Sequence, residues 1–205
     1  MPEAATTRVL CPSAAATRRL GQALGHELVG GDVVVLTGDL GAGKTTFVQG
    51  LARGLGVTAP VTSPTFVLAR HQRTDPAGPR PDGPDLVHVD AYRLAGALEL
   101  DDLDLDSDLD HAVVVVEWGH GLAERLSPRR VEVTIDRDGT PSDGAAGPGD
   151  GAGDGVGDGV GDGTGDEPRR ITVVVVGDHP RLGPGALLVA ARRADPEHTD
   201  LEAPC

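Results

Sequence analysis

Aromatic residues and lysine are scarce in this chain of 205 residues. One tryptophan, one tyrosine and two phenylalanines make up the 2% of the sequence that is aromatic. Lys44 is the only lysine among the 18 basic residues. An ammonium group is a compact point charge, whereas a guanidinium is a planar fork of donors, so the two are not interchangeable. A single lysine in an arginine-rich chain therefore indicates that Lys44 has a specific role.

Cysteines and long apolar runs are also few. Cys11 and Cys205 lie near opposite ends, form neither a redox-pair nor a metal-ligand spacing, and leave no cysteine at the position that prenylation requires. The first ten residues include Glu3 and lack the apolar core of a signal peptide. The apolar runs are about five residues long, far short of the ~20 that a membrane helix needs. We expect a soluble, cytoplasmic protein without membrane association.

The chain has no surplus of basic charge, because its net charge is −14. Residues 138–168 hold eight acidic residues and no basic one, so the rest of the chain carries less than half of that charge. Domains that grip nucleic acid usually present a basic face. We therefore expect any action on RNA to proceed through a partner protein.

A phosphate-binding loop is the strongest motif in the sequence. The residues Gly38-Asp39-Leu40-Gly41-Ala42-Gly43-Lys44-Thr45-Thr46 match the pattern of Gly, four residues and Gly-Lys-Ser/Thr without a gap. The β-branched run 33–37 before it is typical of a buried strand, and the apolar positions after it share one helical face. Such a turn presents backbone N–H groups and a helix dipole to phosphates, while Lys44 adds a charge and the Thr45 hydroxyl suits a magnesium ion.

Two carboxylates follow runs that are typical of buried strands. Asp90 follows 86–89, and Glu117 follows the four valines at 113–116. Parallel strands bring their carboxyl ends to one edge of a sheet, where open α/β folds bind ligands. Magnesium-assisted phosphate chemistry needs a carboxylate there to hold the metal or its water shell. We expect both acids in the site; the alternative for each is a turn cap or a surface acid.

The four aromatic residues lie in the same segments. Trp118 and Tyr92 closely follow the two carboxylates, Phe66 lies in the segment 61–68, and Phe47 lies in the helix after the loop. In a chain so poor in aromatics, this placement predicts pocket walls or a docking face. For Phe47 a core position is favoured.

The remaining pattern predicts the other elements. We expect a strand at 8–10, a helix capped by Ser13, a turn leading into a strand at 61–68, a loop at 74–85, a short helical piece at 122–126, an antiparallel pair at 131–135 and 170–176, and a short helix or strand at 186–193. Residues 99–110 alternate leucine with acids, which favours a solvated helix with a leucine stripe over a metal site. Residues 149–166 repeat Gly and Asp without the nine-residue period of calcium-binding β-helices, so a disordered hairpin loop is favoured.

Four ordered motifs resemble the TsaE family, the bacterial ATPase of the tRNA threonylcarbamoyladenosine pathway. They are Gly38 to Phe47, Ser63-Pro64-Thr65-Phe66, His88-Val89-Asp90-Ala91-Tyr92-Arg93 and Glu117-Trp118, and the resemblance covers roughly residues 8–193. It implies an α/β P-loop NTPase domain with a mixed, mainly parallel sheet, antiparallel edge strands and helices on both faces. We expect a single domain at 1–193 with a disordered insertion at about 138–168, and a flexible tail at 194–205.

The resemblance also implies roles for individual residues. Nucleotide binding falls to Gly38, Asp39, Gly41, Ala42, Gly43, Lys44, Thr45, Thr46 and Trp118, and magnesium binding to Thr45 and Glu117. Asp90 is implied to be needed for hydrolysis by orienting water, and Thr65 to lie in a switch-like segment near the γ-phosphate. The implied cofactors are ATP and Mg²⁺, and the implied partner is a TsaB–TsaD-like complex through which tRNA is reached indirectly.

Two other functions stay open on the sequence. A small-molecule kinase also uses a phosphate loop, and Arg125, Arg129 and Arg130 are candidates for its lid. A nucleotide-sensing scaffold binds ATP without hydrolysing it. A GTPase is disfavoured because its guanine-binding loop needs a lysine that this chain lacks. For the ATPase we expect slow intrinsic turnover, because no second arginine lies near the loop in the sequence.

Overall fold

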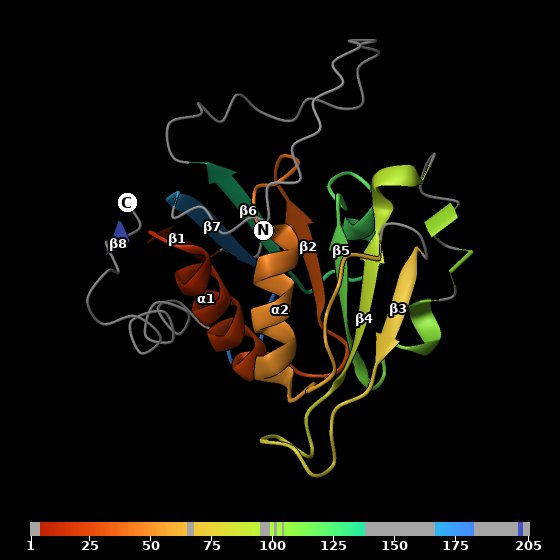
Figure 1. Ribbon diagram of the computed structural model, residues 1–205. Helices are drawn as coiled ribbons and strands as arrows, with labels where there is room; N and C mark the ends of the chain where they lie inside the picture. Colours follow the sequence, from red (N-terminus) through yellow and green to blue (C-terminus); the bar gives the residue numbers. More distant parts are fainter. Residues whose placement is uncertain are drawn as a thin grey trace, which may run out of the picture.

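A mixed β-sheet organises the part of the chain that the computed structural model describes, which is residues 5–64, 68–94, 99–100, 102–103, 105–137, 167–182 and 201–202. The strands are β1 (Ala5–Cys11), β2 (Val33–Thr37), β3 (Ala69–Gln72), β4 (Asp85–Asp90), β5 (Ala112–Glu117), β6 (Arg130–Arg137), β7 (Arg169–Val176) and β8 (Leu201–Glu202). Their order across the sheet is β3-β4-β5-β2-β6-β7-β1-β8 (Figure 1).

The centre of the sheet is parallel and its edges are antiparallel. The strands β4, β5, β2 and β6 run parallel to one another. Antiparallel β3 borders β4, and β7, β1 and β8 extend the other side. The valine-rich β5 is buried at every position because both faces of the central strands are covered, whereas β6 alternates buried and half-buried positions. The predicted α/β class with antiparallel edge strands is confirmed.

Helices cover both faces of the sheet. The α-helices α1 (Ala14–Glu27) and α2 (Lys44–Leu55) pack on the face that carries Val34, Leu36 and Val115. The other face packs Val33, Val35 and Val114 against buried leucines and the 3-10 helices η2 (Leu105–Ser107) and η3 (Ala123–Arg125). A third 3-10 helix, η1 (Ala91–Arg93), follows β4.

The acidic segment 99–110 is helical only in part, whereas a solvated helix with a leucine stripe is predicted for it. Its described part contains the 3-10 turn η2, and Leu100 and Leu105 are buried against the valines of the sheet. The leucines nevertheless pack inward, as expected of the predicted stripe: Leu100 is helical and Leu105 lies in η2. No cluster of three or more metal-ligating side chains occurs among the described residues, and several acidic residues of this segment lie outside them.

Four glycines bring the two α-helices into backbone contact. Gly21 and Gly25 on α1 face Gly50 and Gly54 on α2, each pair four residues apart and therefore on one side of its helix. A Cβ atom built on Gly25 would lie 2.2 Å from the carbonyl oxygen of Leu51. The helix that begins at the phosphate loop is thus held at a fixed, short distance from α1.

We expect Gly54→Ala to destabilise the protein. In an isolated helix this change would stabilise by about 1 kcal/mol. Here the new Cβ would lie 2.2 Å from the carbonyl oxygen of Gln22 and 2.9 Å from Gly25 Cα, so the helices must separate. A net loss of about 1–3 kcal/mol in the free energy of unfolding is expected from urea denaturation. Exposed Arg53→Ala, the neighbouring change on α2, should stay within about 0.5 kcal/mol, and an equal effect of both variants would contradict this interpretation.

The proline-rich loop at 74–85 docks at the ends of both α-helices. Arg80 donates from Nη1 to the carbonyl oxygens of Gly25 (2.8 Å) and Gly54 (3.1 Å), and from Nη2 to that of Leu28 (3.0 Å). These carbonyls lie in the last turns of α1 and α2, where helices leave acceptors without partners and favour a positive charge. Burial lowers the pKa of the Arg80 guanidinium below its ordinary value.

Most of the other predicted elements are confirmed. Ser13 Oγ accepts from Ala16 N at the start of α1, and β6 pairs antiparallel with β7. The strand expected from the segment 61–68 begins at Ala69. The predicted helix or strand at 186–193 and the tract at 138–166 lie outside the described residues.

Candidate functional site

The phosphate loop joins the end of β2 to the start of α2. Gly38, Gly41 and Gly43 have backbone φ angles of 148°, 73° and 108°, which residues other than glycine rarely adopt. A Cβ on Gly38 would also lie 2.4 Å from the carbonyl oxygen of Ile135. Both the φ angle and this close approach therefore require glycine at position 38. Gly43 is the N-cap of α2 and provides no side-chain cap. The first N–H groups of α2 are therefore left for an anion.

Lys44 is buried at the centre of this loop. Its Nζ donates to the carbonyl oxygens of Gly38 (2.7 Å) and Asp39 (2.9 Å), and lies 3.8 Å from the centroid of the Trp118 ring. Burial lowers the pKa of Lys44 below its ordinary value, while the nearby Glu117, Asp90 and Asp39 oppose this shift by raising it. The ammonium thus lies between carbonyl dipoles, an aromatic face and three carboxylates.

A hydrogen-bonded chain connects the loop to the end of β5. Thr45 Oγ1 donates to Glu117 Oε1 at 3.2 Å, and His88 Nε2 lies 2.9 Å from the same oxygen. An ionised carboxylate only accepts, so with Glu117 ionised it is Nε2 that donates. His88 is fully buried on β4, and its Nδ1 has no hydrogen-bond partner in the described structure. The imidazole therefore directs its polar contact at Glu117.

Asp90 lies beside Glu117 because the two residues are directly paired on neighbouring parallel strands. Its Oδ1 accepts from Tyr92 N at 3.1 Å, which caps η1, and only 6% of the residue is exposed. The predicted meeting of the two carboxylates at one edge of the sheet is confirmed as geometry. Asp90 also caps a turn, which was the alternative reading for both acids. Glu117 instead contacts the side chains of Thr45 and His88.

Trp118 adopts a backbone conformation that is rare outside glycine, with φ at 60°. Its backbone N–H donates to the Leu36 carbonyl at 2.9 Å, and the centroid of its ring lies 5.2 Å from that of the Tyr92 ring. A strained backbone of this kind persists where the surroundings determine it and is frequent at functional sites. Here the strain places the only tryptophan over Lys44. Phe47 is fully buried, as predicted, and Phe66 lies outside the described residues.

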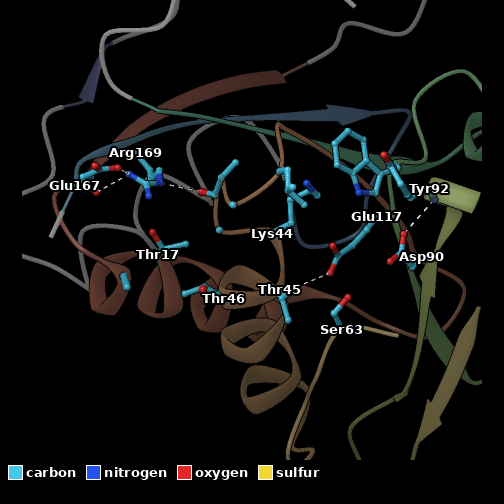
Figure 2. A pocket seen from close by; sticks show the side chains of 16 residues that line it. Thr17, Lys44, Thr45, Thr46, Ser63, Asp90, Tyr92, Glu117, Glu167 and Arg169 are labelled. Carbon is cyan, nitrogen blue, oxygen red and sulfur yellow. Dashed lines mark hydrogen bonds and ion pairs between the residues drawn. The ribbon is translucent and has the colours of Figure 1, made fainter. Parts of the chain in front are cut away.

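These groups line one cavity of about 440 Å³, within the range of ligand pockets (Figure 2). Its walls are Ala14, Thr17, Leu40, Gly41, Ala42, Gly43, Lys44, Thr45, Thr46, Ser63, Asp90, Tyr92, Glu117, Trp118, Glu167 and Arg169. Of the residues predicted from the sequence, Gly38 and Asp39 lie behind the wall and hold Lys44 through their carbonyls. Thr65 lies outside the described residues, although Ser63 of the same motif lines the cavity.

The arginines that are distant from the loop in the sequence are brought to it by the fold. Arg169 Nε donates to the Ala42 carbonyl at 2.9 Å, and Arg137 Nη2 donates to the Leu40 carbonyl at 3.3 Å. The two arginines pair across β6 and β7, which bring them to the loop from more than 90 positions away. The slow turnover expected for the protein stays a prediction, although the reason given for it holds for the sequence and not for the folded structure.

The arginines proposed for a kinase lid lie elsewhere. Arg129 Nη2 is 3.0 Å from Asp32 Oδ1, just before the start of β2 and thus at the opposite end of that strand from the cavity. Arg130 Nη2 pairs with Glu132 Oε1 at 2.7 Å. None of the three candidate lid arginines lines the cavity.

The donor set suits a magnesium ion that is shared with a nucleotide. Within the described residues the cavity offers the Thr45 hydroxyl and the Glu117 carboxylate side by side, and no protein cage of three or more metal-ligating side chains. Magnesium is usually held by one or two such groups together with substrate phosphates and water. In the described part of the chain, no helix is both long and apolar enough to cross a membrane.

Comparisons with known proteins agree with this geometry. The family model of the threonylcarbamoyl adenosine biosynthesis protein TsaE matches residues 11–143. The chain is similar to the tRNA threonylcarbamoyladenosine biosynthesis protein TsaE of Mycobacterium tuberculosis, at 57% identity over 127 residues (59% of this chain and 73% of that protein). The corresponding Streptomyces coelicolor protein is 55% identical over 122 residues (58% and 78%). The crystal structure of Bacillus subtilis YdiB superposes with a TM-score of 0.60 at 27% identity, covering 95% of this chain and 99% of that one.

Proposed function

The chain belongs to the TsaE family, and on this premise we propose that it is a magnesium-dependent ATPase that acts in the biosynthesis of threonylcarbamoyladenosine in tRNA. The observation that carries the proposal is the 3.2 Å hydrogen bond between Thr45 and Glu117, which joins the phosphate loop to an acid at the end of a neighbouring strand. Phosphate loops pair in this way with strand-end carboxylates in nucleotide hydrolases.

The residues of the cavity divide the work. The N–H groups at the start of α2 and the Lys44 ammonium bind the phosphates, with Thr46 toward the α-phosphate. Thr45 and Glu117 would hold Mg²⁺, which neutralises charge on the outer phosphate oxygens when bound. Asp90 orients a water molecule toward the γ-phosphorus, whose bond to the bridging oxygen breaks to give ADP and phosphate. Trp118 and Tyr92 form an apolar wall that limits access of bulk water.

We place the contact with a TsaB–TsaD-like complex at the mouth of the cavity. Leu40 and Tyr92 are the two exposed large hydrophobic residues of the described structure, with 85% and 66% of their surfaces exposed, and both line the mouth. An apolar rim of this kind favours docking of a protein. The net charge of −14 favours indirect access to tRNA through that partner.

Phosphate release from ATP tests the proposed activity. The purified full-length chain should release phosphate with Mg²⁺ present and stop when the metal is chelated. Stoichiometric transfer of phosphate to an added small-molecule acceptor would instead favour a kinase. Nucleotide binding without phosphate release, also in the presence of the partner complex, would favour the scaffold.

Replacing His88 should weaken the response to magnesium. His88→Ala removes the donor that holds Glu117 Oε1 and leaves a buried carboxylate oxygen with one partner fewer. We expect the Mg²⁺ concentration for half-maximal phosphate release to rise about tenfold, whereas ATP affinity measured in EDTA changes less than about threefold.

His88→Gln is the matched control, because its amide N–H can still donate to Glu117. It should restore at least part of the magnesium response. An unchanged magnesium requirement in a folded His88→Ala variant would show that Glu117 is positioned without His88.

A further inference from the structure

Arg169 lies at the end of the cavity opposite to the two catalytic candidates. Figure 2 shows Arg169, Glu167 and Thr17 on one side, Asp90 and Glu117 on the other, and the loop between them. Arg169 is the first residue of β7 and lies outside the stretch 11–143 that matches the family model.

Hydrogen bonds hold the guanidinium of Arg169 in place and still leave one of its nitrogens available to a ligand. Nε donates to the Ala42 carbonyl at 2.9 Å, which fixes the plane of the group against the phosphate loop. Nη1 donates to the backbone carbonyls of Glu167 (2.9 Å) and Pro168 (3.2 Å) and lies 3.4 Å from Glu167 Oε2. Nη2 has no hydrogen-bond partner among the described residues, and 14% of the side chain is exposed. An arginine with spare N–H groups at the wall of a phosphate pocket is suited to an oxyanion.

The carboxylate on Arg169 is the one contact that an anion can replace without disturbing the fold. Glu167 is 67% exposed, and its ion pair with Arg169 is long. Exposed pairs of this kind contribute little free energy, so an oxygen of a phosphate chain, which as a whole carries several negative charges, can take the place of the carboxylate. The Nε bond to Ala42 is independent of Glu167 and keeps the guanidinium in position during this exchange.

We propose that Arg169 binds the phosphate chain of the nucleotide at its nucleoside end, in exchange for the carboxylate of Glu167. The inference rests on the proposed function, because it takes the triphosphate to run from Arg169 and Thr46 toward Glu117 and Asp90. The ligand class is a nucleoside di- or triphosphate. Arg169 acts in binding, since it lies away from the acids that face the γ-phosphate.

Calorimetric titration of the full-length chain with ADP and with ATP tests this assignment. Arg169→Ala should raise the Kd by about tenfold to a hundredfold, as expected for loss of a charge-assisted hydrogen bond, and by the same factor for both nucleotides. A loss confined to ATP would place Arg169 at the γ-phosphate and overturn the proposal. Arg170→Ala removes the same charge from the next residue, which is exposed on the opposite face of β7, and should change the Kd less than about twofold.

Glu167→Gln tests whether phosphate replaces the Glu167 carboxylate on Arg169 or whether Arg169 only stabilises the structure of the phosphate loop. It should lower the Kd by about two- to fivefold in the wild-type background and have no effect when combined with Arg169→Ala. Improvement in both backgrounds would show that Glu167 acts only as a distant repulsive charge. No improvement in the wild-type background would mean that Arg169 merely braces the loop, and either result overturns the exchange.

Thermal unfolding without nucleotide shows whether Arg169→Ala is folded, and Glu167→Gln, an exposed conservative change, keeps the proposal testable if it is not. A wild-type chain that binds neither nucleotide would refute the proposed function together with this inference. Wild-type binding that Arg169→Ala leaves unchanged would refute this inference alone.

Discussion

Asp90→Asn is expected to lower the rate of phosphate release by about 10²- to 10³-fold while ATP binds about as tightly as before. The asparagine keeps the oxygen that accepts from Tyr92 N, so the turn at η1 is preserved. What is lost is the negative charge beside Glu117 that can orient water and take up its proton. Phosphate release measured at saturating ATP, together with calorimetric binding, separates the two effects.

The matched control for Asp90→Asn is Asp82→Asn, which makes the same change at an exposed loop position before the start of β4. It should leave phosphate release unchanged within about twofold. Full activity in Asp90→Asn would remove Asp90 from the mechanism. A strong loss in Glu117→Gln alone would then make Glu117 the acid on which hydrolysis depends.

Lys44→Ala should raise the Kd for ATP by at least about 100-fold, because several charge-assisted contacts to phosphate are lost together. Without the ammonium, the nearby Asp39, Asp90 and Glu117 also leave the cavity negatively charged. Lys44→Arg is expected to restore little, since a planar guanidinium does not fit the two carbonyls that hold the compact ammonium.

Calorimetry is the suitable measurement for Lys44→Ala, because Lys44 contacts Trp118 and its removal will alter the tryptophan fluorescence by itself. Arg53→Ala removes a positive charge from an exposed position of the same helix and serves as the control. An ATP affinity within about threefold of the wild type in Lys44→Ala would contradict a phosphate-binding role for the loop.

The loop, the strand before it and the helix after it could be predicted because their determinants are local. Glycines at fixed spacing, a β-branched run and one apolar helical face act within about 20 residues. The carboxylates Asp90 and Glu117 could be placed together because parallel strands leave little freedom for their ends. His88 was missed as a contact of Glu117, although its position two residues before Asp90 puts both side chains on one face of β4.

The arginines could not be placed from sequence patterns. Arg80 caps two helices, and Arg169 and Arg137 contact the phosphate loop, through hydrogen bonds that span 26 to 127 positions. A guanidinium group donates to any carbonyl oxygen that the fold places within reach. The periodicity of the sequence does not indicate which carbonyl that will be. The role of the glycines in α1 and α2 could not be predicted either. From its low helix propensity alone, a glycine within a helix is expected to destabilise it, and its role in close packing is visible only with the facing helix in place.

By itself the sequence determined that this protein has a phosphate loop between a buried strand and a helix, with two acids at the ends of neighbouring strands. Only the tertiary structure decided that His88 holds Glu117, that Trp118 covers Lys44, and that an arginine of β7 lies at the other end of the cavity. The first set follows from short-range backbone preferences and strand geometry. The second depends on which distant side chains packing brings within hydrogen-bonding distance, and that is fixed only when the whole sheet is assembled.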